Sequence, residues 1–164
     1  MTFSARSNHQ FRRVKLTTWP DEGFESYAGE ISRGWDSVSE LIVVVDDDTA
    51  LLTLIEMMLR RSQFRVMTLD DPRDALDLIN SITPSLFILD VMMPRINGVE
   101  LCKQIRSHPR TSHVPIIMLS AMGVSDSFSK VLEAGADTFL SKSTLHHDLV
   151  SNVQKLIRRT ADYG

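Results

Sequence analysis

Residues Leu41–Asp48 read LIVVVDDD, a run of five apolar residues followed by three aspartates. Short runs of β-branched residues that do not alternate with polar residues are typical of strands buried on both faces. Asp48 or Thr49 can cap the helix predicted by the Leu-, Ile- and Met-rich stretch that continues to about Arg61. The segment therefore predicts a buried strand with an acidic carboxyl end, followed directly by a helix.

The alternation of strand and helix continues to about residue 160. The predicted strands are Leu41–Val45, Phe64–Leu69, Leu86–Leu89, Val114–Leu119 and Thr138–Ser141. The later helices are predicted to begin at Pro72 after an aspartate cap, at Gly98, near 127 and at Leu145, with stops at His108-Pro109 and at Gly135. Five such units predict an α/β fold, (βα)5, whose doubly wound, five-stranded parallel sheet has the flavodoxin-like order 2-1-3-4-5.

Residues 1–39 differ from the rest of the chain. Glycines and Pro20 interrupt them and no period of 2 or 3.6 is sustained, so we expect a mostly irregular N-terminal extension, a domain at 40–160 and a tail at 161–164. Residues 1–18 hold four basic residues and no acid, which leaves 14 basic against 21 acidic residues in the remainder. This acidic body argues against a general nucleic-acid-binding protein.

The composition is that of a globular domain, with 43% hydrophobic and 24% charged residues. The longest apolar runs have five or six residues, far short of the roughly 20 that a membrane span needs. Cys102 is the only cysteine in the sequence, which excludes an internal disulfide framework and a cysteine-based zinc site. We therefore expect a cytoplasmic protein without a membrane span.

The polar side chains that follow the first, third, fourth and fifth predicted strands form the candidate site. In open parallel sheets, binding sites lie beyond the carboxyl ends of the strands. The residues at these ends are Asp46–Asp48 after the first strand, Asp90 after the third, Ser120 after the fourth and Lys142 after the fifth. Two carboxylates about 4 Å apart repel by roughly 4 kcal/mol at an effective dielectric of about 20, so a cation must offset their charge.

Oxygen ligands suit a hard divalent cation, and Mg²⁺ binds one or two carboxylates together with water and phosphate oxygens. We expect Asp47 and Asp90 to be the main ligand pair for Mg²⁺. Asp46 would bind directly or through water, and the backbone carbonyl of Met92 would complete the protein's share.

The lysine and the hydroxyl suit a phosphoryl group. Lys142 supplies a compact positive charge and Ser120 a donor hydroxyl. Together with the metal they favour transfer of a phosphoryl group to a carboxylate. Asp90 is the candidate acceptor, because it stands alone at a strand end facing the metal.

Taken together, these segments resemble the receiver domain of two-component response regulators (CheY-like). The resemblance rests on VVVDDD at 43–48, DVMMP at 90–94 with Asn97-Gly98, LSA at 119–121, and AGAD at 134–137 followed by Phe139 and Lys142. Each motif alone is weak, but all of them occur in order on the predicted (βα)5 pattern over about residues 40–160.

This resemblance implies that Asp90 accepts a phosphoryl group from the phosphohistidine of a histidine kinase or a phosphotransfer protein, with Mg²⁺ as cofactor. It also implies that Asp46 and Asp47 form the acidic pair at the metal. Ser120 and Lys142 would contact the phosphoryl group. Receivers are not enzymes with a separate substrate; they catalyse their own phosphorylation and slow dephosphorylation.

The resemblance further implies a conformational switch built on Ser120 and Phe139. The hydroxyl and Lys142 are drawn toward the added charge, the loop after the fourth strand shifts, and the aromatic ring turns inward. Because the chain ends at Gly164 without an output domain, we expect a stand-alone regulator. It would signal to an unidentified protein target without direct contact to nucleic acid.

Two residues depart from the family pattern. Ser143 replaces the proline that usually follows the lysine, often through a cis peptide bond. A cis bond before a residue other than proline costs about 3–4 kcal/mol, which favours a trans peptide and would displace Lys142 slightly. Phe139 replaces tyrosine as the switch aromatic and has no hydroxyl.

Two alternatives stay open on the sequence alone. DDDTA at 46–50 is similar to the nucleophile motif of haloacid-dehalogenase-like phosphatases, which would make Asp46 the nucleophile of a Mg²⁺-dependent phosphohydrolase. Ala50 departs from that motif, however, and no later acidic motif of those phosphatases follows. The other alternative is a degenerate receiver that acts as a scaffold, for which Ser143 is the only support.

Overall fold

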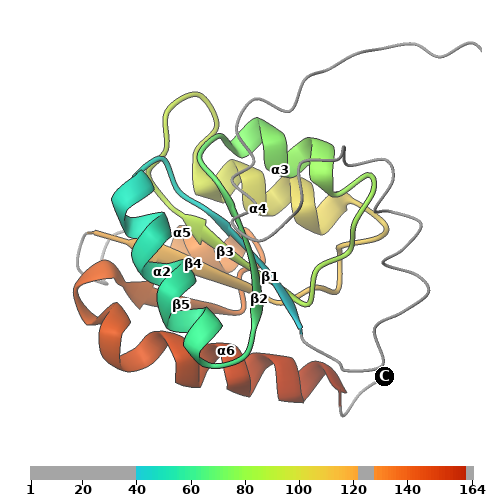
Figure 1. Ribbon diagram of the computed structural model, residues 1–164. Helices are drawn as coiled ribbons and strands as arrows, with labels where there is room; N and C mark the ends of the chain where they lie inside the picture. Colours follow the sequence, from blue (N-terminus) through green and yellow to red (C-terminus); the bar gives the residue numbers. More distant parts are fainter. Residues whose placement is uncertain (1–39, 122–127, 162–164) are drawn as a thin grey trace, which may run out of the picture.

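Five parallel strands form one sheet with helices on both of its faces. The computed structural model describes residues 40–121 and 128–161, so the predicted N-terminal extension and most of the predicted tail lie outside the described residues. The strands are β1 (Leu41–Val45), β2 (Arg65–Leu69), β3 (Leu86–Asp90), β4 (Ile116–Ser120) and β5 (Thr138–Ser141). They pair in the order β2-β1-β3-β4-β5, all parallel, which confirms the predicted doubly wound topology (Figure 1).

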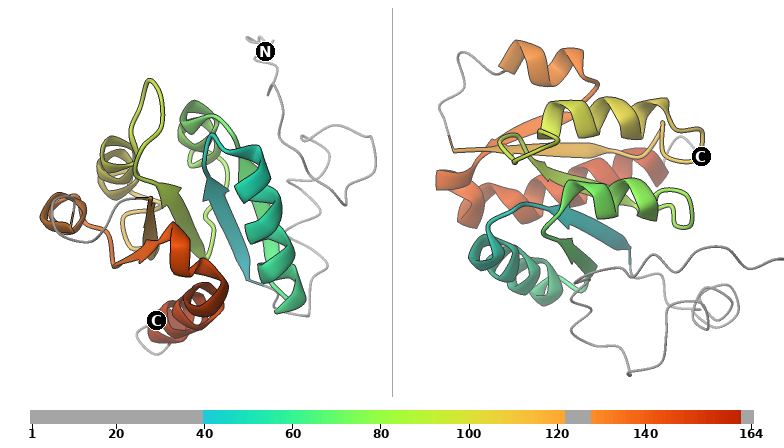
Figure 2. Two further views of the ribbon diagram at one scale, coloured as in Figure 1. Left: turned by 90° about the vertical axis from the view of Figure 1, so that its left-hand side faces the viewer. Right: turned by 90° about the horizontal axis from the view of Figure 1, so that it is seen from above.

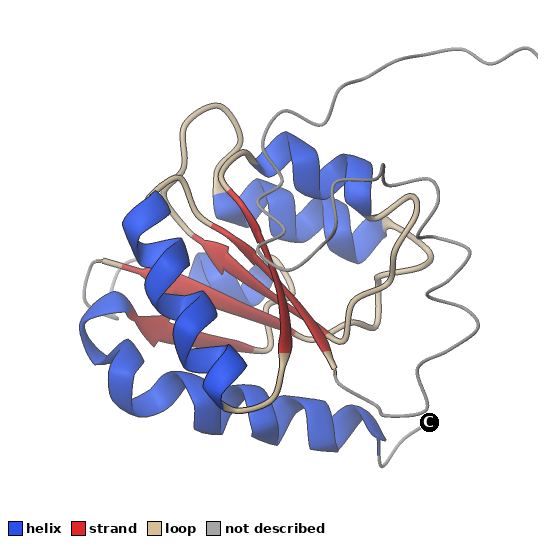
Figure 3. Cartoon of the chain, viewed as in Figure 1, coloured by secondary structure: helices blue, strands red, loops and turns tan. Residues whose placement is uncertain are grey.

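The helices connect the strands and cover the sheet from both sides (Figure 2 and Figure 3). They are α2 (Thr49–Arg61), α3 (Pro72–Leu78), α4 (Gly98–Ser107), α5 (Phe128–Glu133) and α6 (Leu145–Ala161), with a short 3₁₀ turn, η1 (Lys142–Thr144), before the last. No helix within the described ranges is long and apolar enough to cross a membrane.

Two separate apolar clusters fill the two faces, because the strands are apolar on both sides. One cluster is built from the sheet, α3, α4 and α5, and its members include Phe87, Leu89, Leu101, Met118 and Val131. The other is built from the sheet, α2 and α6, and its members include Ile42, Ile88, Ile55, Leu119 and Leu149. Successive residues of β3 therefore enter opposite clusters, which explains why the apolar runs in the sequence do not alternate with polar residues.

Local signals begin and end the helices where the sequence predicts. The Asp48 side chain caps α2, Asp71 caps α3 with Pro72 in the first turn, and Asn97 caps α4. Gly135, which follows α5, has a φ of +92°, a left-handed conformation that residues with a β-carbon rarely adopt.

One strand begins later than predicted. The apolar run predicts a strand from Val114, whereas β4 begins at Ile116. The Val114 N–H donates instead to the Thr111 carbonyl at 3.1 Å, and Pro115 has no N–H to donate. Neither residue can therefore donate to the sheet, while the other strand bounds agree with the prediction to within one residue.

Candidate functional site

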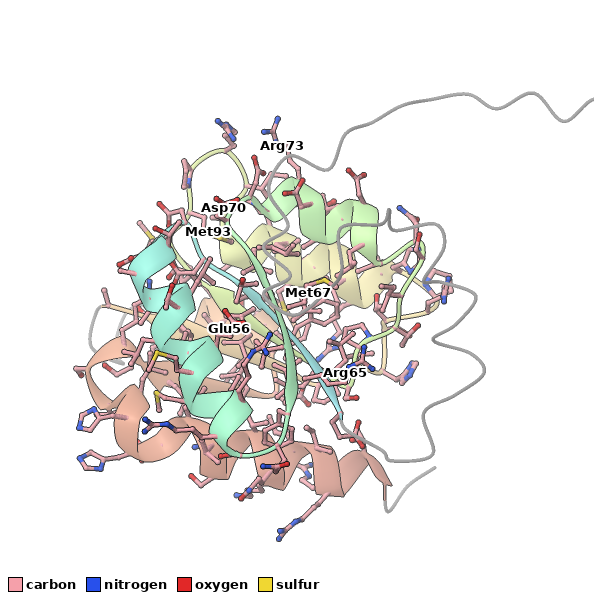
Figure 4. The ribbon with its side chains drawn as sticks, in the orientation of Figure 1. Glu56, Arg65, Met67, Asp70, Arg73 and Met93 are labelled. Carbon is pink, nitrogen blue, oxygen red and sulfur yellow. The ribbon has the colours of Figure 1, made fainter. Side chains whose placement is uncertain are left out.

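Asp46 and Asp90 lie side by side at the carboxyl ends of the neighbouring strands β1 and β3. The ladder between β1 and β3 is in register at these ends, so the residue that follows each paired position falls at the same edge of the sheet. Figure 4 shows Asp70 and Met93, from the loops after β2 and β3, at this upper edge, with Arg65 toward the opposite end of the sheet. The topology thus brings the predicted acidic residues together.

Lys142 joins the two aspartates. Its Nζ lies 2.7 Å from Asp46 Oδ2 and 3.2 Å from Asp90 Oδ1. The Asp46 side chain is fully buried and that of Asp90 is 4% exposed, whereas Lys142 is 21% exposed. The other Asp46 oxygen, Oδ1, accepts a hydrogen bond from the Asp48 N–H at 2.9 Å. A lysine at the end of β5 therefore offsets part of the charge of two buried carboxylates.

Asp47 is the third carboxylate of the site and is exposed. One oxygen each of Asp46, Asp47 and Asp90 lies within 4.8 Å of the other two. Asp46 Oδ2 is buried and, within the described part of the chain, has no partner in hydrogen-bond geometry besides its ion pair with Lys142. Three converging carboxylates fit a hard divalent cation such as Mg²⁺.

Burial and charge both act on the ionisation of the site. Burial raises the pKa of Asp90, and the negative charge of Asp46 raises it further, against the opposing effect of Lys142. Burial acts to lower the pKa of Lys142, but its contacts with Asp46 and Asp90 outweigh burial and raise that pKa. The lysine therefore stays charged, and a further cation would favour the ionised form of Asp90.

The two predicted switch residues share one face of the sheet. In the ladder between β4 and β5, Met118 pairs with Phe139 and Ser120 pairs with Ser141. Residues two apart on a strand point to the same side, as do direct partners on parallel strands. Ser120 is buried, and the half-buried Phe139 packs against the cluster formed with α3 and α4. The geometry thus places Ser120 on β4 and Phe139 on β5, on the same face of the sheet.

The peptide bond between Lys142 and Ser143 is trans, and no cis peptide bond occurs among the described residues. The sequence suggested that a trans bond would displace the lysine. Lys142 nevertheless reaches both Asp46 and Asp90, because the chain turns directly after β5 in the 3₁₀ turn η1. Ser143 therefore gives no support to a degenerate site.

Met92 can contribute through its backbone alone. The residue is 68% exposed, and its backbone N–H donates a hydrogen bond to the Asp90 carboxylate. The loop is closed by the Gly98 N–H, which donates to the Val91 carbonyl at 3.0 Å. The role of the Met92 carbonyl as a metal ligand stays a prediction.

Sequence analysis did not find the ion pair between Asp71 and Arg95. Arg95 Nη1 lies 2.9 Å from Asp71 Oδ2 and links the loop after β3 to the N-cap of α3. A hydrogen bond from the Arg73 side chain, with the charges of Arg73 and Arg95, lowers the pKa of Asp71 to about 2. The sequence carries only the capping signal of Asp71, because the pair depends on a left-handed Arg95 backbone with a φ of 69°.

The fold and the site together define a doubly wound α/β protein with an acidic, lysine-containing site that fits a divalent cation. The family model described as the response regulator receiver domain matches residues 42–154. The chain therefore belongs to the response regulator receiver domain family.

Curated relatives agree with this assignment. The chain is 36% identical over 125 residues to the alkaline phosphatase synthesis transcriptional regulatory protein PhoP of Bacillus subtilis, which covers 75% of this chain and 50% of that protein. It is 40% identical over 119 residues to the response regulator MprA of Mycolicibacterium vanbaalenii, covering 73% and 51%. The chain thus spans about half the length of the curated relatives it matches.

Solved structures show the same fold. A putative response regulator from Chloroflexus aurantiacus matches with a TM-score of 0.71 and 33% identity, covering 74% of this chain and 99% of that chain. The receiver domain of the sensor histidine kinase PA1611 from Pseudomonas aeruginosa matches with a TM-score of 0.68 and 27% identity, covering 73% and 98%. That structure is described as having a magnesium ion coordinated in the active site cleft.

Proposed function

We propose that this chain is a phosphoacceptor, in which Asp90 takes up a phosphoryl group from the phosphohistidine of a histidine kinase or a histidine phosphotransfer protein. The observation that carries the proposal is the position of Lys142, whose Nζ lies 2.7 Å from Asp46 and 3.2 Å from Asp90. A positive charge held against two buried carboxylates at a strand end suits the arrival of a phosphoryl group. Membership of the receiver family supports the proposal.

In the proposed step, an Asp90 carboxylate oxygen attacks the phosphorus atom. A bond from phosphorus to this oxygen forms as the bond from phosphorus to the imidazole nitrogen breaks. The imidazole leaves with the bonding electron pair and then takes up a proton. Lys142 and Ser120 hold the phosphoryl oxygens, whose charge is greatest during the transfer.

Mg²⁺ is the cofactor that the site fits. The carboxylates of Asp46, Asp47 and Asp90 and the backbone carbonyl of Met92 would hold it, and its charge would stabilise the transferring phosphoryl group. In the described structure, Asp46 Oδ1 accepts the Asp48 N–H and Asp46 Oδ2 pairs with Lys142. Asp90 has the same kinds of contact, with Lys142 and with the Met92 N–H, so these contacts do not distinguish a ligand from a nucleophile; the match to the receiver family is what favours Asp90 over Asp46 as the acceptor.

The phosphoryl group would act as a switch by adding negative charge beside Ser120 and Lys142. Attraction of these groups shifts the loop after β4 and changes the space available to the half-buried Phe139 on the neighbouring strand. Two packings of the surface formed by β4, α5, β5 and α6 would then differ in population. Slow loss of the phosphoryl group to water, without a separate substrate, would reset the switch.

The downstream partner and the output remain predictions from the sequence. Two relatives are named as a transcriptional regulatory protein and a DNA-binding response regulator, and the chain spans only about half of each. We propose that the receiver domain itself signals by contact with a protein target in the cytoplasm and does not bind nucleic acid directly, because residues 19–164 carry 14 basic against 21 acidic residues.

Intact mass after incubation with acetyl phosphate and Mg²⁺ tests the function directly. The wild-type chain should gain one phosphate, and Asp90→Asn should gain none. Asp48→Asn is the matched control, because asparagine also caps helices and the variant loses the same charge next to the site. An unchanged gain in Asp90→Asn would reject the assignment, and loss of the gain in Asp46→Asn alone would favour the phosphohydrolase.

A further inference from the structure

The turn that carries Lys142 is closed by the hydroxyl of the residue before it. Ser141 is the last residue of β5 and caps η1 with a φ of −76° and a ψ of 135°. Its Oγ accepts a hydrogen bond from the Ser143 N–H at 3.3 Å and lies 2.7 Å from Ser143 Oγ. The Thr144 hydroxyl also donates to the Ser141 carbonyl at 3.4 Å. The backbone on both sides of Lys142 is thus tied to Ser141.

The hydrogen-bonded pairing of β5 with the sheet ends just before Lys142. The ladder between β4 and β5 ends with the pair of Ser120 and Ser141. From there the chain leaves the sheet, and its direction depends on the turn. The lysine side chain is flexible, so its ammonium can occupy many positions, and a fixed backbone direction at this residue reduces their number and favours those near the carboxylates.

The turn directs the Lys142 side chain toward the two buried carboxylates of the site. With the turn closed, Lys142 Nζ reaches Asp46 Oδ2 at 2.7 Å and Asp90 Oδ1 at 3.2 Å through a trans peptide bond to Ser143. A serine before a short helical turn favours this geometry, because its side-chain oxygen accepts an N–H two residues later. The Ser141 hydroxyl therefore restricts the backbone around Lys142 through a hydrogen bond, as a proline at the next position could do through its ring.

We propose that Ser141 is a positioning residue whose hydroxyl fixes the turn that directs Lys142 toward Asp46 and Asp90. The inference rests on the proposed function only for its effect on phosphorylation. The effect of Ser141 on the position of Lys142 can be measured through the affinity of the site for Mg²⁺, without any phosphoryl transfer.

Two opposite effects should follow from loss of the hydroxyl. A lysine that is less firmly held spends less time against the carboxylates, so Mg²⁺ meets less competing positive charge and binds more tightly. The same lysine contacts the phosphoryl group less often, so phosphorylation slows. General damage to the site would instead weaken both Mg²⁺ binding and phosphorylation, which makes the direction of the Mg²⁺ effect diagnostic.

The experiment compares Ser141→Ala with wild type in the full chain. Titration calorimetry with MgCl₂ should show binding tightened by about two- to threefold, since one nearby charge is loosened and not removed. The initial rate of phosphate gain from acetyl phosphate, followed by intact mass, should fall by about three- to tenfold. Ser141→Thr, which keeps the hydroxyl, should restore both. Ser151→Ala, which removes a hydroxyl bonded to its own helix on α6, should change neither.

A double-mutant cycle separates positioning from structural damage. In a Lys142→Ala background, Ser141→Ala should have no further effect on Mg²⁺ affinity or on the phosphorylation rate, because its action runs through the lysine. Weaker Mg²⁺ binding in Ser141→Ala, wild-type behaviour, or full effects that persist without Lys142 would each overturn the proposal. If wild type gains no phosphate, the proposed function fails, while the Mg²⁺ titrations still decide the role of Ser141.

Discussion

A β-carbon on Gly98 would lie 2.0 Å from the backbone carbonyl oxygen of Asp90. The first residue of α4 therefore rests against the end of β3 at a distance that only glycine allows. The contact positions the start of this helix against the strand that carries the proposed phosphoacceptor.

Gly98→Ala should destabilise the fold by about 2–3 kcal/mol, because backbone atoms must move to admit the methyl group. The sign of this change in stability is informative, since replacing glycine by alanine at an unhindered helical position normally stabilises a protein by about 1 kcal/mol. Urea unfolding measures the effect. Glu100→Ala, an exposed substitution in the same turn, should stay within about 0.5 kcal/mol of wild type. A Gly98→Ala variant as stable as wild type would contradict the close approach.

Mg²⁺ should stabilise the chain through Asp47. A ligand at 100 times its Kd that binds only the folded state adds about 2.7 kcal/mol to the free energy of unfolding. Thermal unfolding with and without Mg²⁺ should show most of this gain lost in Asp47→Asn, whose side chain is exposed and supports no core packing. The gain should remain in Asp48→Asn, which carries the same change of charge one residue later. Equal gains in the two variants would exclude Asp47 as a ligand.

Most of the fold follows from the sequence because each strand is buried on both faces. Runs such as Leu41–Val45 then contain no polar residue, and the glycines, prolines and capping aspartates between them mark where helices begin and end. The start of β4 could not be predicted from hydrophobicity, since Val114 is as apolar as the strand that follows. Its N–H is used in a turn with Thr111, and this depends on the path of the loop.

The site was predictable only as far as strand ends define it. Parallel strands bring Asp46, Asp90 and Lys142 to one edge whatever the loops do. The hydroxyl contacts of Ser141 and the pair of Asp71 with Arg95 depend instead on backbone turns that no periodicity encodes. For the same reason, the replacement of proline by serine after Lys142 suggested a displaced lysine, whereas Lys142 lies within 3.2 Å of both Asp46 and Asp90 in the structure.

Asp71 should stabilise the fold in a pH-dependent way. Its pKa is lowered from 3.8 to about 2 by the Arg73 hydrogen bond and the neighbouring arginine charges. A lowered carboxyl pKa gives stability that is present above about pH 4 and lost as the pH falls toward about 2. Asp71→Ala, which also removes the cap of α3, should cost about 1 kcal/mol at neutral pH.

The difference in free energy of unfolding between wild type and Asp71→Ala should be smaller when urea unfolding is repeated at a pH near 2 than at neutral pH. Asp77→Ala, an exposed aspartate on the same helix, serves as the control and should show little difference from wild type at either pH. A cost of Asp71→Ala that does not change with pH would mean that packing, and not the carboxylate charge, accounts for it.

Asp90→Asn should stabilise the Mg²⁺-free chain at neutral pH, by about 1 kcal/mol, because it removes a buried charge that faces Asp46. Burial and Asp46 raise the pKa of Asp90 above its ordinary 3.8, so the folded state binds this proton more readily than the unfolded state. Wild-type stability should therefore fall as the pH rises from about 4 through the folded pKa, and the asparagine variant should lack this fall. Urea unfolding across this pH range in the presence of a chelator measures the fall, with the exposed Asp77→Asn as control.

Added Mg²⁺ should make wild type more stable than Asp90→Asn, since the ion offsets the charge of Asp90 in wild type alone. A destabilised Asp90→Asn without Mg²⁺ would mean that attraction to Lys142 outweighs burial, contrary to the raised pKa.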